Sequence, residues 1–308
     1  MITKIVAVQG NNPLKLNPVT DTSIFLAHEI QSKNYKIFYY DPKDLSVINS
    51  KVIASGAFIE FSYKNKKFFK ILKKQKLELT KCKFILIRQD PPFNLEYISA
   101  TYILDTIKNK VKILNNPTSI RNISEKLYSV KYQKYMPSTI FTQNINEIKN
   151  FFKTHKKVIL KPIHSYGGND IHLLNKFNSK LINQFIKKHD HIMCQKFLPK
   201  ISKGDKRVFL INGKVCGAIS RVPKQGSFLS NLSKGAKPIN IKLTKTENKI
   251  SKIIARDLKK ENIFFAGIDF IDQKLNGDIN VTSPTGLKTL YDLSGINLAK
   301  TFWKELKI

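Results

Sequence analysis

Cysteine is scarce in this chain of 308 residues, which contains only Cys82, Cys194 and Cys216. No two of them are close in sequence and no CxxC motif is present, so a disulfide framework or a zinc site is not expected. All three lie in apolar segments that resemble strands. We therefore expect buried thiols in a reducing compartment.

Long apolar runs are also absent. No uninterrupted stretch approaches the roughly 20 residues that a membrane span requires. The first apolar run, Ile5–Val8, is too short for the hydrophobic core of a signal peptide. We expect a soluble, cytoplasmic protein without a membrane partner.

Acidic residues and arginine are few, whereas lysine is abundant. Lys and Arg total 54 against 22 Asp and Glu, which gives a net charge of +32, and five arginines leave 49 lysines. Such a charge could serve nucleic-acid binding. However, the lysines are scattered, and we interpret the densest run, 64–83, as a solvated face above Phe68, Phe69, Ile71 and Leu72. Because nucleic-acid binders usually rely on arginine, we expect no specific nucleic-acid partner, and the positive field would attract small anions.

Signatures of covalent catalysis are missing as well. The chain has no G-x-S-x-G motif, no Walker A motif and no cysteine with an evident histidine partner. Its six histidines show no metal-ligand spacing, although His164 lies in a glycine-containing loop. The sequence therefore points away from a nucleophilic mechanism.

The first 120 residues alternate between strand and helix patterns. This alternation predicts an α/β fold with a doubly wound, mostly parallel sheet. Ligands of such sheets bind beyond the carboxyl ends of the strands, which would place Gly10, Arg88–Pro92 and Asn116 at one edge. The expected strands are 2–8, 36–40, 84–87 and 111–114, with two short strands around Gly56 in 51–63, and the helices are 24–31 (capped by residues 21–23) and 95–107.

From about residue 125 the pattern changes to hairpins, as in an α+β fold. Strands 158–161 and 171–174 flank a glycine loop and would form a hairpin lid, followed by a helix at 181–188 and a strand at 192–197. Asn212-Gly213 predicts a type I′ turn between strands 207–211 and 214–221. We expect a second turn at Asn276-Gly277 between strands 264–271 and 278–281, an amphipathic helix at 244–260 and a terminal helix within 286–306.

Two groups of residues suggest phosphate and metal binding. Lys161 ends a buried strand shortly before Gly167 and Gly168, whose backbone N–H groups could approach phosphate oxygens. An ordinary hairpin with a solvated lysine is the alternative. Asp278 and Asn280 leave the same face of one strand. Asp269, on the strand before it, can lie opposite, and three oxygen donors would suit Mg²⁺. The alternative is a set of polar residues at the end of a hairpin.

The arginines and one strand end complete the set of candidates. In so lysine-rich a chain, each arginine is expected where its planar fork is needed. Arg207 and Arg221 lie on neighbouring hairpin strands, and Arg88 ends a strand, although structural ion pairs are the alternative for these residues and for Arg121. Arg256 is expected to be a surface or packing residue on an amphipathic helix. The strand end at 195–198 could present backbone groups to an adenine ring or be a plain strand end.

Taken together, the motifs resemble the ATP-grasp superfamily, and more closely the prokaryotic type of glutathione synthetase. The resemblance covers almost the whole chain and rests on the order and spacing of its motifs. These are Ile87–Phe93, Thr101–Leu104, Asn116-Pro117, Glu125–Leu127, Ile159–Pro162, Gly204–Arg207, Arg221–Pro223, Asn231-Leu232, Gly267–Asp269 and Asp278–Pro284.

The resemblance implies an ATP-grasp fold in three parts: an N-terminal Rossmann-like substrate domain (1–122), a central lid (123–200) and a C-terminal antiparallel-sheet catalytic domain (201–308). It implies an ATP- and Mg²⁺-dependent ligase, with Mn²⁺ as a substitute, that joins γ-glutamylcysteine to glycine through an acyl phosphate and releases ADP and phosphate. It also implies a homo-oligomer, as a tetramer.

The resemblance also implies roles for individual residues. Arg207 and Arg221 would steady the acyl phosphate. The metal ligands would be Asp269, Asp278 and Asn280, and the dipeptide would contact Asp21, Ser23, Arg88 and Asn231. ATP would contact Lys126, Lys161, Gly167, Gly168, Gln195, Lys196, Phe197, Leu198 and Asp205.

Three positions depart from the family pattern. His164 and Ser165 stand where a carboxylate and a glycine are usual, and Asp278 replaces the usual glutamate. The loop 226–238 lacks an expected arginine and several glycines. These departures leave open an ATP-grasp ligase with a different amine acceptor, and the charge leaves open a basic nucleic-acid-binding protein without enzymatic activity.

Overall fold

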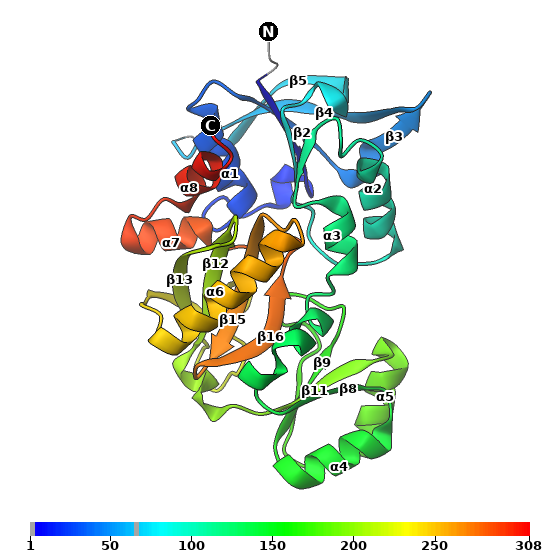
Figure 1. Cartoon of the computed structure of the whole chain (residues 1–308), viewed down its shortest axis with the longest axis vertical. Helices are drawn as coiled ribbons and strands as arrows, with labels where there is room; N and C mark the ends of the chain where they lie inside the picture. The colour runs from blue at the N-terminus through cyan, green and yellow to red at the C-terminus, as the bar shows by residue number, and fades with distance from the viewer. Residues whose placement is uncertain (1–3, 65–67) are drawn as a thin grey trace.

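Three β-sheets follow one another along the chain in the computed structural model, which describes residues 4–64 and 68–308 (Figure 1). The predicted strand 2–8 and the lysine run 64–83 each lie partly outside these residues. The N-terminal sheet has the order β3-β4-β2-β1-β6-β7, with β5 paired to β4. Its strands are β1 (Ile5–Gln9), β2 (Lys36–Tyr40), β3 (Leu45–Ile48), β4 (Lys51–Phe61), β5 (Phe69–Glu78), β6 (Phe84–Ile87) and β7 (Lys112–Leu114).

The N-terminal sheet is parallel only at its centre. The pairs of β1 with β2, β1 with β6 and β6 with β7 are parallel, whereas β2, β3 and β5 all pair antiparallel with β4. The prediction of two short strands around Gly56 is wrong, because β4 runs through it. A Cβ at Gly56 would meet Phe38 and Tyr40 at 2.9 Å, so this glycine allows close strand packing and does not interrupt the strand.

The lysine-rich segment forms the edge strand β5 of this sheet. Phe68 and Phe69 pack against the core as expected. Ile71 and Leu72, however, are 47% and 56% exposed, so the prediction that they lie beneath the lysines is wrong. The side chains of Ile71 and Leu72 therefore face solvent, whereas Leu77 of the same strand is buried.

The central sheet is the smallest and is antiparallel throughout, in the order β10-β9-β11-β8. Its strands are β8 (Thr139–Thr142), β9 (Val158–Pro162), β10 (His172–Leu174) and β11 (Ile192–Lys196), packed against α4 (Ile145–His155) and α5 (Ser179–His189). The predicted hairpin of β9 and β10, with its glycine loop, is confirmed.

The C-terminal sheet is also antiparallel, in the order β14-β13-β12-β15-β16. Asn212 and Gly213 both have positive φ angles, which confirms the predicted turn. The turn predicted at Asn276-Gly277 is wrong, because Asp272 and Gln273 adopt the left-handed conformation in its place. The strands are β12 (Asp205–Ile211), β13 (Lys214–Val222), β14 (Lys237–Asn240), β15 (Phe265–Ile271) and β16 (Lys274–Asn280).

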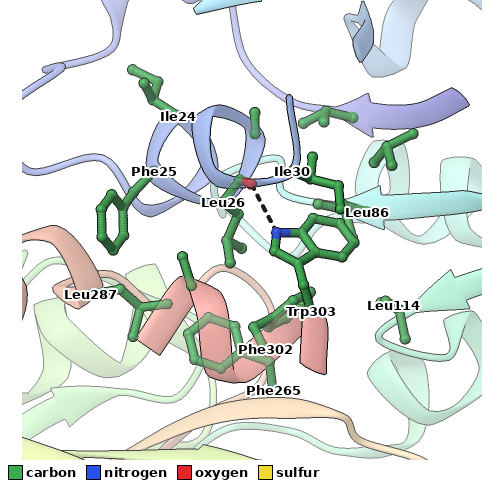
Figure 2. Close-up of a cluster of buried hydrophobic side chains, with 14 of the residues drawn as sticks. Ile24, Phe25, Leu26, Ile30, Leu86, Leu114, Phe265, Leu287, Phe302 and Trp303 are labelled. Carbon is green, nitrogen blue, oxygen red and sulfur yellow. Dashed lines mark hydrogen bonds between the residues drawn. The ribbon is translucent and has the colours of Figure 1, made fainter. Parts of the chain in front are cut away.

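Helices cover the sheets and join the two ends of the chain. α1 (Thr22–Gln31), capped by Asp21, packs with α7 (Leu287–Ser294) and α8 (Leu298–Glu305) between the N- and C-terminal sheets (Figure 1). In this core Trp303 is fully buried and its indole Nε1 donates to the Leu26 carbonyl at 2.9 Å, as Figure 2 shows. α2 (Leu95–Asp105) and α3 (Pro117–Asn122) cover the other face of the N-terminal sheet, and α6 (Lys245–Lys260) covers the C-terminal sheet.

Within the described ranges, the helices are too short or too polar to cross a membrane.

Candidate active site

A cavity lies between the central and C-terminal sheets and is lined by residues of both. Apart from Asp21, Ser23 and Arg88, every residue that the sequence placed in the site lines this cavity. They are Lys126, Lys161, Gly167, Gly168, Gln195, Lys196, Phe197, Leu198, Asp205, Arg207, Arg221, Asn231, Asp269, Asp278 and Asn280.

Two buried lysines from different parts of the chain face one carboxylate. Lys126 precedes the 3₁₀ segment Leu127–Tyr135, and Lys161 lies on β9. Their ammonium groups are 3.5 and 3.6 Å from the two carboxylate oxygens of Asp278, and both side chains are almost inaccessible to solvent. Burial lowers the pKa of Lys161, while Asp278 opposes this effect. Two cations aimed at one point in a closed site are suited to bind phosphate oxygens.

Beside them, Arg207 and Arg221 form a buried network with two aspartates. Arg207 donates Nε and Nη2 to Asp269 at 2.5 and 2.8 Å, and Arg221 donates the same atoms to Asp205 at 2.8 and 2.5 Å. Arg221 Nη2 also lies 3.1 Å from Asp269. Burial alone would raise the pKa of Asp269, but the two guanidinium groups hold it at about 2. The Nη1 sides of both arginines remain the ones that can face an incoming anion.

Part of the cavity lining is apolar and includes residues just beyond the end of β11. Ile159, Phe197, Leu198, Ile201 and Ile271 line it. This combination of an apolar slot and a strand end suits a flat heteroaromatic ring, as the sequence analysis expected for 195–198. Gln195 contributes mainly to structure, because its buried amide donates to Thr139 Oγ1 at 2.9 Å.

Two loops lie against each other at the cavity. Gly168, with a φ of 74°, packs so tightly on Asn231 that a Cβ would collide with the Asn231 amide oxygen. Lys234 Nζ donates to Asn169 Oδ1 at 2.9 Å. Lys126 Nζ also donates to the Ser165 carbonyl at 2.9 Å, which ties the glycine loop to the rest of the site. The glycine loop therefore rests on the loop 226–238, and His164 lies outside the cavity lining.

A second groove adjoins the first cavity, and residues lining both include Glu125, Arg207, Arg221, Asn231 and Asn280. Its lining includes Asp21, which precedes α1, and Asp90, which follows β6. Lys15 and Lys234 also line it. Reactants held in the two spaces would therefore meet beside the two arginines.

Arg88 and Ser23, expected to contact substrate, lie behind the wall of this groove. Arg88 Nε donates to Ser23 Oγ at 3.0 Å and Arg88 Nη2 donates to the Pro284 carbonyl at 3.0 Å. Burial lowers the Arg88 pKa and raises that of Asp21, although each charge offsets the effect on the other. In the structure these two residues therefore support the groove and do not line it.

Glu125 and Asn276 are among the cavity residues that the sequence analysis did not predict. Glu125 Oε1 accepts from the backbone N–H groups of Val281 and Thr282 at 2.9 and 3.1 Å and from Thr282 Oγ1 at 2.8 Å. Asn276 holds Lys161 through its backbone carbonyl and its amide oxygen, at 3.0 and 2.9 Å. The adjacency of Glu125 to Lys126 could have indicated the first. Asn276 was assigned to a turn, which concealed its role.

The oxygen donors of the site fit a hard divalent cation. Asp269, Asp278 and Asn280 line one side of the cavity, and Asn280 Nδ2 donates to the Gly267 carbonyl, which turns its amide oxygen the other way. Among the described residues no group of three or more His, Cys, Asp and Glu side chains could hold a metal. A site of two carboxylates and one amide would leave positions for phosphate oxygens and water, as Mg²⁺ prefers.

Two antiparallel sheets with a cavity between them, lined by paired lysines and arginines, and an attached Rossmann-like sheet define the ATP-grasp fold. Solved structures with this fold agree over nearly the full chain. One is the ATP-grasp ligase PsnB complexed with a phosphomimetic variant of minimal precursor, Mg and ADP (TM-score 0.66, 12% identity, 99% of this chain and 98% of that one). Another is the D-cycloserine synthetase DcsG (TM-score 0.67, 9% identity, 98% and 99%).

The family model for the N-terminal domain of prokaryotic glutathione synthetase matches residues 5–121, and the model for the ATP-grasp domain of the same enzyme matches residues 125–295. Glutathione synthetase from Agrobacterium fabrum is 31% identical over 99% of this chain and 96% of its own length. The enzyme from Buchnera aphidicola is 35% identical over 95% and 92%. The chain belongs to the prokaryotic glutathione synthetase family.

It is accordingly an ATP-dependent ligase that makes glutathione. This result replaces both alternatives from the sequence analysis, the ligase with a different acceptor and the basic protein without enzymatic activity.

Proposed function

We propose that the enzyme joins γ-glutamylcysteine to glycine in two steps. The cysteinyl carboxylate of the dipeptide takes the γ-phosphoryl group of ATP to give an acyl phosphate and ADP. The glycine amine then attacks the acyl carbon, and phosphate leaves. The observation that carries this proposal is the meeting of the nucleotide cavity and the second groove at Arg207 and Arg221.

The arginines would stabilise the charge that develops during transfer. Asp269 and Asp205 fix the two guanidinium groups before substrate arrives, so little reorganisation is needed during the reaction. Lys126 and Lys161 would hold the phosphates in line. No nucleophilic side chain is required, because the substrate carboxylate is itself the nucleophile of the first step.

The residues Asp269, Asp278 and Asn280 would hold Mg²⁺, or Mn²⁺ in its place. A bound metal ion would neutralise phosphate charge. Asp205, Gly167 and Gly168 would contact the nucleotide, with the adenine beside Gln195–Leu198. The contacts between the glycine loop and the loop 226–238 support a role of the glycine loop as a lid that excludes water from the acyl phosphate.

On the substrate side, Asp21 and Asp90 would bind the ammonium group of the γ-glutamyl residue, and Asn231 would contact the peptide. Arg88 and Ser23 would act from behind, by fixing Asp21. We also propose domains at 1–122, 123–200 and 201–308, because one sheet is assigned to each of them. The cytoplasmic location and the tetramer stay predictions.

The test is phosphate release from Mg·ATP by the purified enzyme with γ-glutamylcysteine, with glycine added or withheld. We expect sustained release only with both substrates and one glutathione for each phosphate. If ATP turnover with γ-glutamylcysteine is supported by another amine and not by glycine, the assignment of the acceptor is wrong. If phosphate is released continuously without any amine, the proposed protection of the acyl phosphate is wrong.

A further inference from the structure

The pairing of β15 with β16 is interrupted beside the nucleotide cavity. Ile268 pairs with Ile279 and Phe270 pairs with Leu275, so three residues, Asn276 to Asp278, lie opposite the single residue Asp269. Such bulges redirect side chains and are frequent next to active sites. Here the bulge places Asn276, Asp278 and Asp269 together in the cavity wall.

The bulge also fits closely beneath the central sheet. Gly277 has a φ of 87°, and a Cβ at this position would collide with Met193 Cε of β11 and come within 3.0 Å of Met136. A residue with a side chain here would have to displace these two methionine methyl groups and to adopt a left-handed backbone conformation. The bulge is accordingly a point where the central sheet rests on the C-terminal sheet.

Asn276 uses both ends of its side chain in this position. Its amide oxygen accepts from Lys161 Nζ at 2.9 Å, and its amide nitrogen donates to Asp278 Oδ2 at 3.1 Å. The Asn276 backbone carbonyl accepts from Lys161 at 3.0 Å. One asparagine thus stands between a buried cation and the carboxylate that faces it.

We propose that Asn276 is a positioning residue for nucleotide binding, which holds Lys161 and Asp278 apart so that the ammonium group is presented to phosphate. The proposal rests on the proposed contact between Lys161 and the nucleotide phosphates.

The physical reason lies in the short distance between the two charges. Lys161 Nζ is already 3.6 Å from Asp278 Oδ2, and the lysine side chain is buried while the carboxylate is partly exposed. An ammonium group has three donors, and Asn276 engages two of them, which leaves the third for an oxygen in the cavity. Without the amide, the lysine can close onto Asp278 as a direct ion pair. A nucleotide would then have to break that pair before it could bind.

The experiment is a calorimetric titration of metal-free ADP into the wild-type enzyme, N276A, K161M and the double variant. We expect N276A to weaken ADP binding about tenfold, the effect of losing one charge-assisted hydrogen bond. K161M should weaken it at least as much. In the double variant the asparagine change should add less than twofold, because two residues that act through one group are not additive. Steady-state kinetics of N276A should show a raised KM for ATP and a smaller change in kcat.

The matched control is N212A, which removes a 2.9 Å asparagine–carboxylate hydrogen bond to Glu305 in a turn far from the cavity. It should lower thermal stability and leave ADP affinity unchanged. Unchanged or tighter ADP binding by N276A, with K161M weakened, overturns the inference alone. An equal loss from N276A with and without Lys161 also overturns it. If K161M binds ADP as well as wild type, the proposed role of Lys161 fails and the inference fails with it.

Discussion

At the scale of single residues, the contacts of the five arginines show where the chain uses a guanidinium group and not an ammonium group. Arg207 and Arg221 each make a two-point contact with a buried aspartate, and Arg121 pairs with Asp105 at 2.9 Å. Arg88 joins Ser23 to the Pro284 carbonyl, and Arg256 is exposed. In a chain with 49 lysines, Arg207 and Arg221 thus use the planar fork of the guanidinium group, in the structural ion pairs that the sequence analysis gave as the alternative.

Replacing Arg207 with lysine tests the value of the fork. An ammonium group cannot make both bonds to Asp269, and a partly unpaired buried carboxylate should cost about 3 kcal/mol of unfolding free energy. Loss of a fixed donor at the transferring phosphoryl group should lower kcat by roughly 100-fold. Urea denaturation and steady-state kinetics measure the two effects.

The control for this variant is Arg121→Lys, since Arg121 pairs with Asp105 near the surface of the N-terminal domain. We expect a loss of at most about 1 kcal/mol and an unchanged kcat. Equal kcat values for the two lysine variants would contradict the assignment of Arg207 to the reaction.

The thiols of the enzyme should be poorly reactive, which matters in a protein whose product is itself a thiol. Burial raises the pKa of Cys82 and of Cys194 to about 12, from an ordinary value of 9.0, and it also raises the pKa of the partly exposed Cys216. Because the thiolate is the reactive form, three pKa units reduce its fraction near pH 8 by about a thousandfold.

Titration of the native protein with a disulfide reagent checks this prediction. Cys216 should react first, and its rate should rise about tenfold per pH unit below pH 9. The two buried thiols should react only after the protein is unfolded. The variant Cys216→Ser should lose the first phase. Rapid reaction of three thiols in the native protein at pH 8 would contradict the assignment.

At the scale of elements, sequence patterns predicted turns correctly where the backbone preferences of the turn residues alone decide the conformation. Asn212-Gly213 gave the correct turn, since both residues tolerate positive φ. The same dipeptide at Asn276-Gly277 lies in a bulge, because Asp272 and Gln273 form the turn, and Gly277 has a positive φ where it packs on Met193. Gly56 likewise serves close packing within a strand. Sequence alone cannot distinguish these cases, because the deciding contact comes from another element.

The lid loop offers a matched pair of glycines. Gly167 and Gly168 both have positive φ, but a Cβ on Gly167 meets only Asn169 Nδ2 at 3.8 Å, whereas one on Gly168 collides with Asn231. Alanine at either position should carry the strain of a left-handed residue, about 1 kcal/mol. Only Gly168→Ala should also separate the lid from the loop 226–238 and raise the KM for ATP, by roughly tenfold.

Steady-state kinetics and limited proteolysis of the lid would compare the two variants. Gly167→Ala should keep a KM within about threefold of wild type and a protected lid in the presence of ATP. Gly168→Ala should be cleaved faster. If the two variants behave alike, backbone strain and not the contact with Asn231 controls closure.

At the scale of the whole molecule, the site is made where segments far apart in sequence meet. Most of its residues could be identified because they lie in short motifs at strand ends, such as Lys161 and Asp278. Arg88 and Ser23 were expected to contact the dipeptide, yet neither lines the groove, and the position of Arg88 depends on Pro284, 196 residues away. Glu125 was missed for a similar reason, because its partners Val281 and Thr282 follow β16.

One side chain, Asn115, joins the N-terminal and C-terminal sheets. It follows β7 and is buried. Its amide nitrogen donates to the carbonyls of Phe265 and Val281, both at 2.7 Å. Its amide oxygen accepts from the N–H groups of Phe264 and Phe265 at 2.9 and 2.8 Å. Each polar atom of the amide is therefore used twice. Asn115 should couple the unfolding of the two parts of the molecule.

Asn115→Ala should leave two buried carbonyls and two buried N–H groups without this partner and reduce stability by about 3 kcal/mol. Calorimetry should then show two unfolding transitions where the wild type shows one. The adjacent Asn116→Ala is the control, because Asn116 only caps α3, with its oxygen 3.2 Å from the Ser119 N–H group. It should cost about 1 kcal/mol and keep a single transition. Since Phe265 begins the strand that carries Asp269, the Asn115→Ala variant should also have a raised KM for γ-glutamylcysteine. A single cooperative transition in Asn115→Ala would show that other contacts couple the two sheets.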